Sequence, residues 1–459
     1  MIPKKKKPSV AFIIMTVLFS VCIVSVAVFS AISMQDKIVP ANSPAVTTTT
    51  EPAVPVKISE ATVGSSGDVL IHVPIFNAAY SSSTKTYDFS NIFTHISKYI
   101  KDCDYFVANL ETTLGGTENG RKYTGYPMFN SPDEITDALK NAGVDCLLTA
   151  NNHCYDTKST GLMRTQEIVE QAGFDHIGTR TSEAENKYLV KDVNGINFGM
   201  VCYTYETETK QENRKALNGI LVGEDSANLI NSFDYTKLDA FYTEMKEQIK
   251  LMKAAGADVL VAYLHWGNEY QLEANNHQKE IAQKLCDMGI DVIVGGHPHV
   301  IQPVELITST DGKRKMVCVY SMGNMVSNQR KQHMGLKTGH TEDGMIFKMT
   351  FSKYSDGSVT FDKIKVIPTW VNLHTSGGKS VYSIVPLGRE MDSKVSKLGL
   401  NLTTNGLSLA KASYDRTAKL VLDGVNDSNK YLASLPKPSE QTTSNKTEET
   451  TAEAISKAA

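Results

Sequence analysis

Five blocks of polar residues in this sequence each follow an apolar run and carry residue types that bind metal ions. Carboxylate and amide oxygens combined with imidazoles suit Mn²⁺, Fe or Zn²⁺, and they do not select Ca²⁺. Two such ions make hydroxide from water and neutralise the charge of a reacting phosphoryl or acyl group. The blocks therefore predict a hydrolytic site with two divalent ions. They are Gly67-Asp68, Asn109-Leu110-Glu111, Asn151-Asn152-His153, His265-Trp266-Gly267 and Gly295-Gly296-His297-Pro298-His299.

Each block taken alone also has a purely structural explanation. A Gly-Asp pair after a strand is commonly a turn or a helix cap, and Asn152 could cap the segment that follows it. The pair His297 and His299 is the most specific, because two glycines let the backbone turn tightly while two imidazoles project. Since all the structural explanations would have to hold together, we favour one shared site. Its candidate ligands are the polar side chains of these blocks, and Glu111 or Asp68 could supply the carboxylate that bridges two ions.

Two further residues are predicted to take part in catalysis. Asp156 follows His153 by three positions and could orient its imidazole, which could then protonate a leaving group. Additional candidates for the site are His72, Asn109, Glu269 and Asn324, and Trp266, Lys122, Tyr126 and His340 are candidate substrate contacts. Glu269 could equally be a carboxylate at the start of a helix, and Trp266 could equally be an aromatic side chain that only packs.

The elements that must position these blocks alternate between strands and helices, which is typical of an α/β fold. In open α/β folds, ligands bind beyond the carboxyl ends of the strands, where the polar blocks fall. The predicted strands are Ala61–Ile71, Asp104–Ala108, Val144–Thr149, Asp258–Leu264 and Asp291–Val294, and the predicted helices are Phe89–Lys101, Pro132–Ala142, Gly161–Ala172, Tyr235–Ala255 and His277–Met288. A late run of strands predicts a second sheet packed on the first, with members Lys315–Tyr320, Gly344–Ser352 and Val359–Pro368.

The N-terminus predicts a membrane anchor. Lys4 to Lys7 precede an uncharged apolar run over residues 10–32, which is long enough to cross a hydrocarbon core of about 30 Å. The lysines place residues 1–9 in the cytoplasm and the rest of the chain outside. A cleaved signal peptide is the alternative, although its apolar region is usually only about 7–15 residues long. Residues 33–58 read as an extended linker, 59–390 as the catalytic domain, 391–434 as a C-terminal extension and 435–459 as a disordered tail.

Composition excludes some classes of function. The net charge of −3 over 459 residues offers no basic surplus to neutralise phosphates, so nucleic acid is not an expected partner. The seven cysteines include Cys22 in the anchor and show no C-x-x-C spacing, so a zinc–thiolate site is not expected. Buried small side chains explain them best, and an extracellular disulfide stays open.

The ordered blocks resemble the CapA (poly-γ-glutamate capsule biosynthesis) family over roughly residues 62–390. The match also includes Ala150 before the third block, Val300 after the fifth, and Ser321-Met322-Gly323-Asn324 further on. That family is similar to a branch of the calcineurin-like metallophosphoesterase superfamily. The resemblance implies a calcineurin-like sandwich of two packed sheets flanked by helices. It also implies that Asp68 and His299 hold one ion, that Asn152, His265 and His297 hold the other, and that Glu111 bridges them where the superfamily usually has Asp.

Two departures from the superfamily pattern leave the number of ions open. The first block normally reads Asp-x-His, whereas Val69 and Leu70 follow Asp68, so His72 would have to take the missing role. The Asn-His pair normally precedes an acidic residue directly, whereas Cys154 intervenes here and the acid is Asp156. A site with one ion, or a degenerate site, is the alternative to two.

Three functions are compatible with these observations. The leading one is an extracytoplasmic metal-dependent hydrolase of the phosphoesterase type, which the resemblance associates with a capsular or poly-γ-glutamate polymer and with the membrane proteins that synthesise and export it. The second is a non-catalytic scaffold subunit of such a complex. A secreted nucleotidase-like phosphatase is the third, but it would need a second domain with aromatic residues that stack on a base, and none is recognisable.

Overall fold

The computed structural model describes residues 54–211, 214–400 and 402–438. The predicted anchor, the cytoplasmic tail, most of the linker and the C-terminal tail from residue 439 lie outside the described residues. Within the described ranges, no helix is both long enough and apolar enough to cross a membrane.

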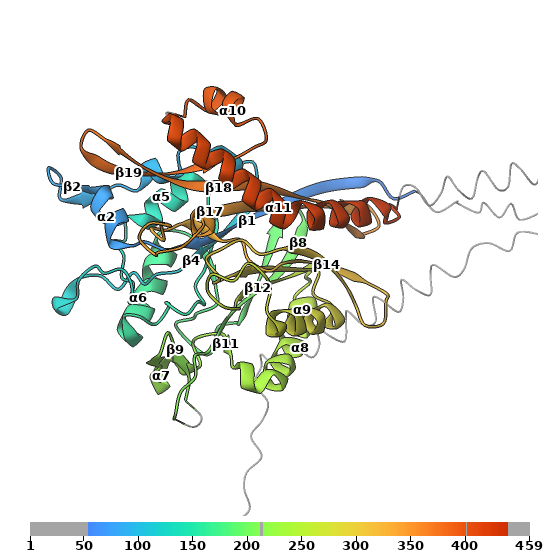
Figure 1. Cartoon of the computed structure of the whole chain (residues 1–459). Coiled ribbons are helices and arrows are strands. Elements are labelled where there is room, and N and C mark those ends of the chain that lie inside the picture. Colours follow the sequence, from blue (N-terminus) through green and yellow to red (C-terminus); the bar gives the residue numbers. More distant parts are fainter. Residues whose placement is uncertain (1–53, 212–213, 401, 439–459) are drawn as a thin grey trace, which may run out of the picture. The chain divides into compact units, whose positions relative to one another are not determined.

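The described strands form two large sheets of mixed direction (Figure 1). The first sheet has the order β19-β18-β17-β1-β4-β5-β6, and β16 pairs with the end of β1. The second has the order β11-β8-β12-β13-β15-β14, and β7 pairs with β8. Strands of the first sheet are β1 (Lys57–Val69), β4 (Tyr105–Leu110), β5 (Cys146–Leu148), β6 (Asp175–Ile177), β16 (Asn324–Val326), β17 (Asp343–Tyr354), β18 (Val359–Ser376) and β19 (Lys379–Pro386). Those of the second are β7 (Tyr188–Val193), β8 (Ile196–Tyr205), β11 (Ser232–Phe233), β12 (Val259–His265), β13 (Val292–Gly296), β14 (Val304–Thr308) and β15 (Lys315–Val319).

Both sheets contain a parallel block, which brings the carboxyl ends of several strands to one edge. In the first sheet β1, β4, β5 and β6 are parallel, and in the second β8, β12, β13 and β15 are. The late strands are divided between the sheets, since β15 joins the second and β17 and β18 extend the first. The expectation that the late strands make the second sheet is therefore wrong. Apolar runs do not encode which distant strand they pair with, whereas the two-sheet α/β arrangement itself agrees with the expected sandwich.

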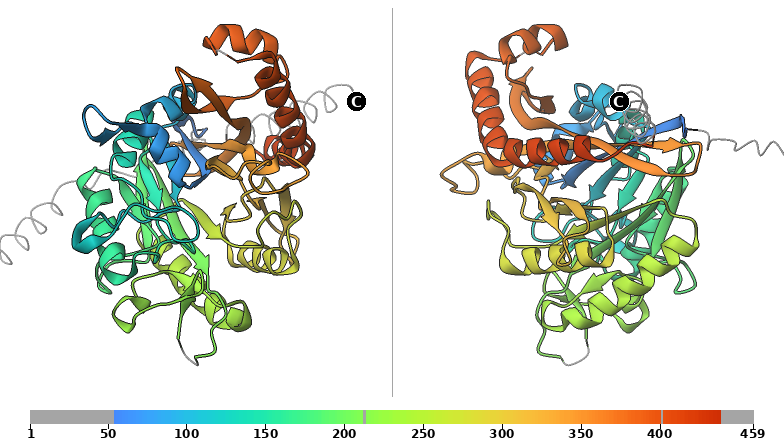
Figure 2. Two further views of the ribbon diagram at one scale, coloured as in Figure 1. Left: turned by 60° about the vertical axis from the view of Figure 1, so that its left-hand side comes forward. Right: turned by 90° about the vertical axis from the view of Figure 1, so that its right-hand side faces the viewer.

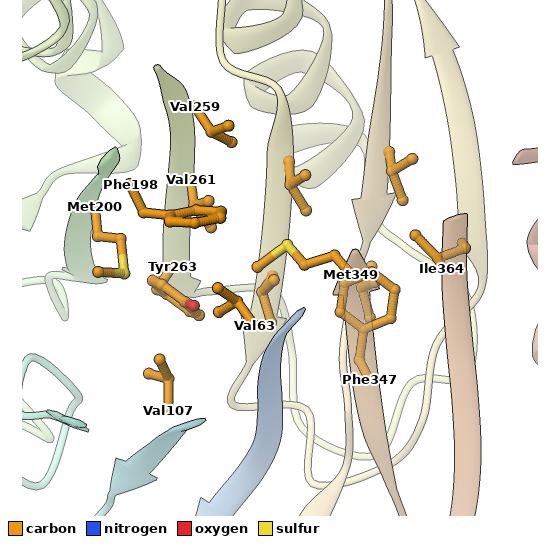
Figure 3. Close-up of a cluster of buried hydrophobic side chains, with 14 of the residues drawn as sticks. Val63, Val107, Phe198, Met200, Val259, Val261, Tyr263, Phe347, Met349 and Ile364 are labelled. Carbon is orange, nitrogen blue, oxygen red and sulfur yellow. The ribbon is translucent and has the colours of Figure 1, made fainter. Parts of the chain in front are cut away.

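The core between the two sheets follows from the alternation of side chains along each strand. In β12 one set faces the other sheet and the alternate set faces the covering helices, so both faces are apolar. Figure 3 shows side chains from both sheets meeting in this core, among them Val63, Val107, Phe198, Val261 and Met349. Each is buried, so the sheets pack as one hydrophobic unit.

Helices cover the outer faces of the sheets. Against the first lie α3 (Ser90–Phe93), α4 (Ser97–Ile100) and α5 (Ile135–Ala142), and against the second α8 (Leu238–Ala254) and α9 (Asn276–Met288). The helix expected over Phe89–Lys101 is therefore two short helices. Other elements are α2 (Val73–Ala79), β2 (Tyr80–Ser81), β3 (Thr86–Tyr87), η1 (Glu118–Gly120), α6 (Lys158–Gln171), β9 (Ala216–Leu217), β10 (Ile220–Leu221), α7 (Glu224–Ala227), η2 (Tyr235–Lys237) and η3 (His340–Glu342).

Helix α9 shows how local sequence sets an element next to the site. Its first turn is a capping box, in which Asn275 accepts from the Gln278 N–H at 2.9 Å and Gln278 accepts from the Asn275 N–H at 3.0 Å. It ends at Gly289, whose φ of 104° is accessible to glycine. The first cap fixes where the loop after β12 enters α9, and the second fixes where the chain leaves α9 toward β13.

The C-terminal extension contains α10 (Met391–Leu398) and the long helix α11 (Thr404–Ser434). Figure 2 shows α11, in red, lying across strands of both sheets, and it contacts β18 and β14. Val421 and Val425 join the core between the sheets. A Cβ on Gly424 would lie 1.6 Å from the Val304 carbonyl oxygen, so only glycine permits this approach. The helix is therefore part of the packed core.

The burial of the cysteines agrees with the interpretation that they are small side chains in the packed interior. All six described cysteines are free, and five of them are buried, with Cys103 partly exposed. No disulfide forms among residues 54–438 in the ranges described.

Candidate metal centre

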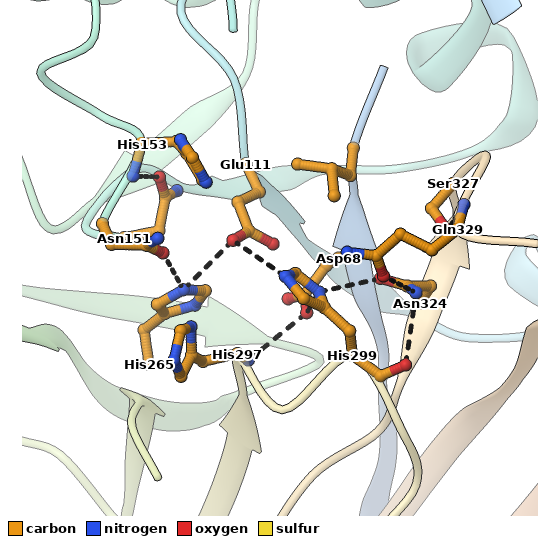
Figure 4. Close-up of polar contacts among 12 residues, drawn as sticks. Asp68, Glu111, Asn151, His153, His265, His297, His299, Asn324, Ser327 and Gln329 are labelled. Carbon is orange, nitrogen blue, oxygen red and sulfur yellow. Dashed lines mark hydrogen bonds and ion pairs between the residues drawn. The ribbon is translucent and has the colours of Figure 1, made fainter. Parts of the chain in front are cut away.

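All five polar blocks deliver side chains to one buried cluster at the carboxyl ends of the strands (Figure 4). Strand alternation explains the direction of several of them. Val261 in β12 faces the core between the sheets, and His265, four positions on, lies on the same side at the strand end. Val107 in β4 also faces this core, so Asn109, two positions on, and Glu111, just past the strand, lie on the same side. The six predicted ligands Asp68, Glu111, Asn152, His265, His297 and His299 are each at most 3% exposed.

The Gly-Gly-His-Pro-His segment is strained at its histidines. His297 has a φ of 93° and His299 has a φ of 55°, and residues other than glycine rarely adopt such positive φ values. Neither Gly295 nor Gly296 has a positive φ, so the expectation that the glycines make the turn is wrong. They are needed for space, because a Cβ on Gly295 would lie 2.0 Å from the Tyr320 carbonyl oxygen and one on Gly296 would lie 2.8 Å from Asp68 Oδ1. Backbone strain of this kind is concentrated at functional sites.

One half of the cluster centres on His265. Its Nε2 lies 2.6 Å from Asn152 Oδ1 and 3.3 Å from Glu111 Oε1. Its Nδ1 lies 3.3 Å from Asn109 Nδ2, and the same amide donates to Asp68 Oδ1 at 2.7 Å. Asn109 therefore links the two halves and leaves the Nε2 side of His265 facing the carboxylate.

The other half centres on His299. Its Nδ1 lies 3.3 Å from Asp68 Oδ2 and 3.1 Å from Asn324 Oδ1, and its Nε2 lies 3.8 Å from Glu111 Oε1. Asn324 is itself held, since its amide donates to Gln329 Oε1 and to the Thr341 carbonyl, each at 3.0 Å. It thus acts on the site by orienting the His299 ring, as an outer partner of a metal ligand does.

The cluster contains buried polar atoms that the described protein groups do not satisfy. Both carboxylate oxygens of Glu111 and Nδ1 of His297 are buried without a hydrogen-bond partner. Such groups are rare because each carries the full cost of desolvation. A cation beside Glu111 would remove that cost, and the donor set of carboxylate, amide and imidazole suits one.

Two groups of three residues have ligand atoms within 4.8 Å of one another, namely Glu111, His297 and His299, and Asp68, Glu111 and His265. Glu111 belongs to both, as a bridging carboxylate would. The two kinds of observation divide the ligands differently. The direct contacts pair Asp68 with His299 and Asn152 with His265, whereas the second group of three places Asp68 with His265. Buried His, Asp and Glu residues could thus hold metal, and the assignment of each ligand to one ion stays a prediction.

Burial and neighbouring charges set the protonation of the cluster. Burial lowers the pKa of His297 well below its usual value, and the neighbouring histidines lower it further, so its imidazole is neutral and able to bind a metal. Burial opposes protonation of His299 too, but the Glu111 and Asp68 carboxylates raise its pKa to about 9. Burial raises the pKa of Asp68, yet its contacts with His299, His265 and Asn109 lower it overall.

His153 and Asp156 form the contact that was expected of them. Nδ1 of His153 lies 2.7 Å from Asp156 Oδ2, and the same oxygen accepts from the Phe129 N–H at 2.6 Å. The Phe129 ring packs edge-on against the imidazole, with centroids 4.8 Å apart. Asp156 can therefore orient His153, whose role in catalysis stays a prediction.

The remaining candidates lie at different distances from the cluster. Nδ1 of His72 lies 3.2 Å from the Leu70 carbonyl oxygen, and burial lowers the pKa of His72 to about 4, but it belongs to neither ligand group. Glu269 is exposed, and its charge helps to raise the pKa of His299, which places it near the rim. Trp266 is fully buried and donates to the Tyr320 carbonyl at 2.9 Å, so it is a packing aromatic. His340 hydrogen-bonds Thr338, and Lys122 and Tyr126 are exposed.

Two residues next to the cluster were not identified from the sequence. The Tyr205 ring packs 4.7 Å from that of His297, and Asn218 donates to the Pro127 carbonyl at 2.9 Å beside His153. Asn151, which the third block includes without a role, donates to Asn109 Oδ1 at 3.1 Å. The dipeptide Asn218-Gly219 is a hairpin signal, but nothing local to it indicates which residues the hairpin meets.

Comparison with known proteins gives consistent results. A family model described as "Bacterial capsule synthesis protein PGA_cap" matches residues 62–329. "Capsule biosynthesis protein CapA" of Bacillus anthracis is 29% identical over 241 residues, which cover 52% of this chain and 54% of that protein. "PGA biosynthesis protein CapA" of Bacillus subtilis (strain 168) is 27% identical over 241 residues, which cover 52% and 57%. The matched region is thus little more than half of either relative.

Among solved structures, the sulfate thiohydrolase SoxB of Thermus thermophilus in complex with glycerol is 14% identical to this chain. The superposition covers 71% of this chain and 47% of that one with a TM-score of 0.34, which is too low to support conclusions about the site.

Proposed function

Because the chain belongs to the PGA_cap family of bacterial capsule synthesis proteins, the CapA family, we propose that it is a metal-dependent hydrolase of the phosphoesterase type that acts on a capsular polymer or its precursor. The observation that carries this proposal is Glu111, whose two buried oxygens lack a hydrogen-bond partner between His265 and His299. The name of the Bacillus subtilis relative supports poly-γ-glutamate (PGA) as the polymer.

The cluster supports hydrolysis through its own residues. Divalent ions held by the six predicted ligands would supply a nucleophilic hydroxide at neutral pH and positive charge for the developing oxyanion. Asn109 and Asn324 hold Asp68 and His299 in place, so their ligand atoms need no reorganisation during the reaction. His153, oriented by Asp156, would give its Nε2 proton to the departing group.

We also propose a cellular location for this enzyme, based on its N-terminal sequence. Residues 10–32 would anchor it in the cell membrane, with the domain on the extracytoplasmic side. There it would meet an anionic surface polymer and the membrane proteins that synthesise and export it.

The test is to purify the full chain, measure bound Mn, Fe and Zn, and assay a phosphodiester and a γ-glutamyl amide. The variant His297→Ala/His299→Ala removes two predicted ligands, and His176→Ala is the matched control because His176 lies 3.2 Å from Glu170 and outside both ligand groups. Wild type and control should bind metal and cleave one of the substrates, and the double variant should do neither. If metal binds but neither bond is cleaved, the scaffold function replaces the hydrolase. If no metal binds after reconstitution, the proposed centre is wrong.

A further inference from the structure

A short hairpin reaches the catalytic pair from a separate part of the chain. Strands β9 and β10 are joined by Asn218 and Gly219, with φ values of 48° and 70°, which is the geometry of a two-residue type I′ turn. Leu217, just before the turn, is fully buried in a small cluster with Cys154 and Tyr155. The tip of the hairpin is therefore anchored next to the segment that carries His153.

The amide of Asn218 contacts three groups there. Its Nδ2 donates to the Pro127 carbonyl at 2.9 Å and lies 3.4 Å from Asp156 Oδ1 and 3.3 Å from His153 Nδ1. The other oxygen of Asp156 accepts from the Phe129 N–H and faces His153 Nδ1. The hairpin thus ties the 127–129 loop and the Asp156 carboxylate together.

The donor and acceptor types around His153 assign its ring hydrogen. An ionised carboxylate only accepts hydrogen bonds, so the 2.7 Å contact between Asp156 Oδ2 and His153 Nδ1 requires the hydrogen to be on Nδ1. The two N–H groups of Asn218 are then directed to the Pro127 oxygen and to Asp156 Oδ1. No hydrogen bond among the described residues engages Nε2 of His153, and Figure 4 shows this ring beside Glu111.

We propose that Asn218 is a positioning residue that holds the His153–Asp156 pair as a proton donor, so that the substrate is an ester or amide whose leaving group needs a proton. This inference rests on the proposed hydrolase function. In the step, hydroxide oxygen bonds to phosphorus or carbon, and the bond to the leaving oxygen or nitrogen breaks. The electron pair goes to the leaving atom, which takes the Nε2 proton of the His153 imidazolium; the neutral ring that remains keeps its Nδ1 hydrogen toward Asp156, and water restores the Nε2 proton later. Alkoxides and amines need this proton, whereas p-nitrophenolate does not.

The chain offers a matched control for this residue. Asn194 and Gly195 form the same kind of turn between β7 and β8, with φ values of 54° and 81°, but there the Asn194 amide donates to the Glu60 carbonyl in the first part of β1. Asp68 lies at the other end of that strand. Asn218→Gly and Asn194→Gly each keep a turn that glycine adopts freely and remove only the amide.

The experiment compares kcat of the full-length variants for methyl phenyl phosphate and methyl p-nitrophenyl phosphate. In Asn218→Gly we expect kcat for the phenyl ester to fall about 10–100-fold, as for other supporting partners, with kcat for the p-nitrophenyl ester and the metal content nearly unchanged. Asn194→Gly should match wild type for both. An equal loss for both esters, or a loss of metal, would show a merely structural role and overturn the inference.

A second measurement does not depend on activity. With ¹⁵N-labelled histidine, wild type and Asn194→Gly should show a downfield Nδ1–H resonance that His153→Gln lacks, because that hydrogen faces a carboxylate. In Asn218→Gly the resonance should broaden or move upfield. An unchanged resonance would overturn the inference even if neither ester is cleaved, whereas the failure of wild type to cleave either ester would count against the proposed function instead.

Discussion

Two buried polar clusters of this protein differ in how their charges are balanced. In the first, the cluster of predicted metal ligands, Asp68 and Glu111 meet three histidines, and both Glu111 oxygens lack a hydrogen-bond partner. The second, which we call the arginine cluster, consists of Arg330, Glu342, Asp343 and Arg416 together with their partners Trp370 and Ser413.

The arginine cluster satisfies its charges internally. Arg330 lies 2.8 Å from Glu342, and both side chains are 7% exposed. Arg416 lies 2.7 Å from Asp343, which also accepts from Ser413 at 2.6 Å. None of these side chains has a buried polar atom without a partner. Complete pairing indicates a structural role, since it joins α11 to the start of β17, whereas incomplete pairing indicates a ligand that completes it.

The largest expected effect that tests this difference is the loss of metal from Glu111→Gln. The amide keeps the shape but removes the negative charge shared by both ligand groups. We expect bound metal to fall to background in elemental analysis, a greater loss than the about 10–100-fold that outer partners cost. The matched control is Glu342→Gln, which should keep its metal. Retention of metal by Glu111→Gln would remove the distinction between the clusters.

Breaking the arginine cluster should instead destabilise the fold. Arg330→Met leaves the buried Glu342 carboxylate without its cation, which should lower the free energy of unfolding by about 3–5 kcal/mol. Denaturant unfolding of the variant measures this. Replacing both partners, in Arg330→Met/Glu342→Leu, should recover much of the loss. A single variant as stable as wild type would mean that the pair is not a structural ion pair.

A smaller effect is expected from Asn324→Ala, which removes the acceptor for His299 Nδ1. Metal affinity should fall about 10–100-fold, as measured by competition with a chelator, because the ring loses its fixed orientation. Asn372→Ala is the control, since Asn372 is also a buried asparagine but contacts His374 outside the ligand groups. Equal affinities for the two variants would argue against an orienting role for Asn324.

The smallest effect concerns protons. Because the pKa of His299 is raised to about 9, metal binding near neutral pH should displace about one proton, and affinity should rise about tenfold per pH unit up to about pH 9. Without metal, the same raised pKa stabilises the fold below the usual histidine pKa of 6.5, and this contribution is lost as the pH rises through about 9. Titration calorimetry in buffers of different ionisation enthalpy measures the released proton. Binding without proton release would show that His299 is neutral.

Several features could be predicted from local sequence because they depend on short-range periodicity. The strand before His265 and the one before Glu111 are apolar on both faces, so their positions and their polar ends are visible in the sequence. Side-chain alternation then directs these polar residues to one side. The ordered blocks also gave the family, which the comparisons confirm.

Long-range contacts decided the rest. Which sheet β15 or β17 joins depends on pairing between residues far apart in sequence, which an apolar run does not specify. The positive φ values of His297 and His299 lie beside two glycines that Tyr320 and Asp68 approach closely, and these neighbours are distant in sequence. The place of α11 in the core and the contact of Asn218 with His153 likewise depend on segments that meet only after folding.

The sequence by itself determined the ligand types, their order and the strand ends that carry them, because residue chemistry and period-two alternation are local properties. Only the tertiary structure decided that both oxygens of Glu111 are left without hydrogen-bond partners, while Glu342 is paired with an arginine. Whether a buried carboxylate is neutralised by a side chain or needs a cation depends on what the fold places beside it, and no local pattern encodes that neighbour.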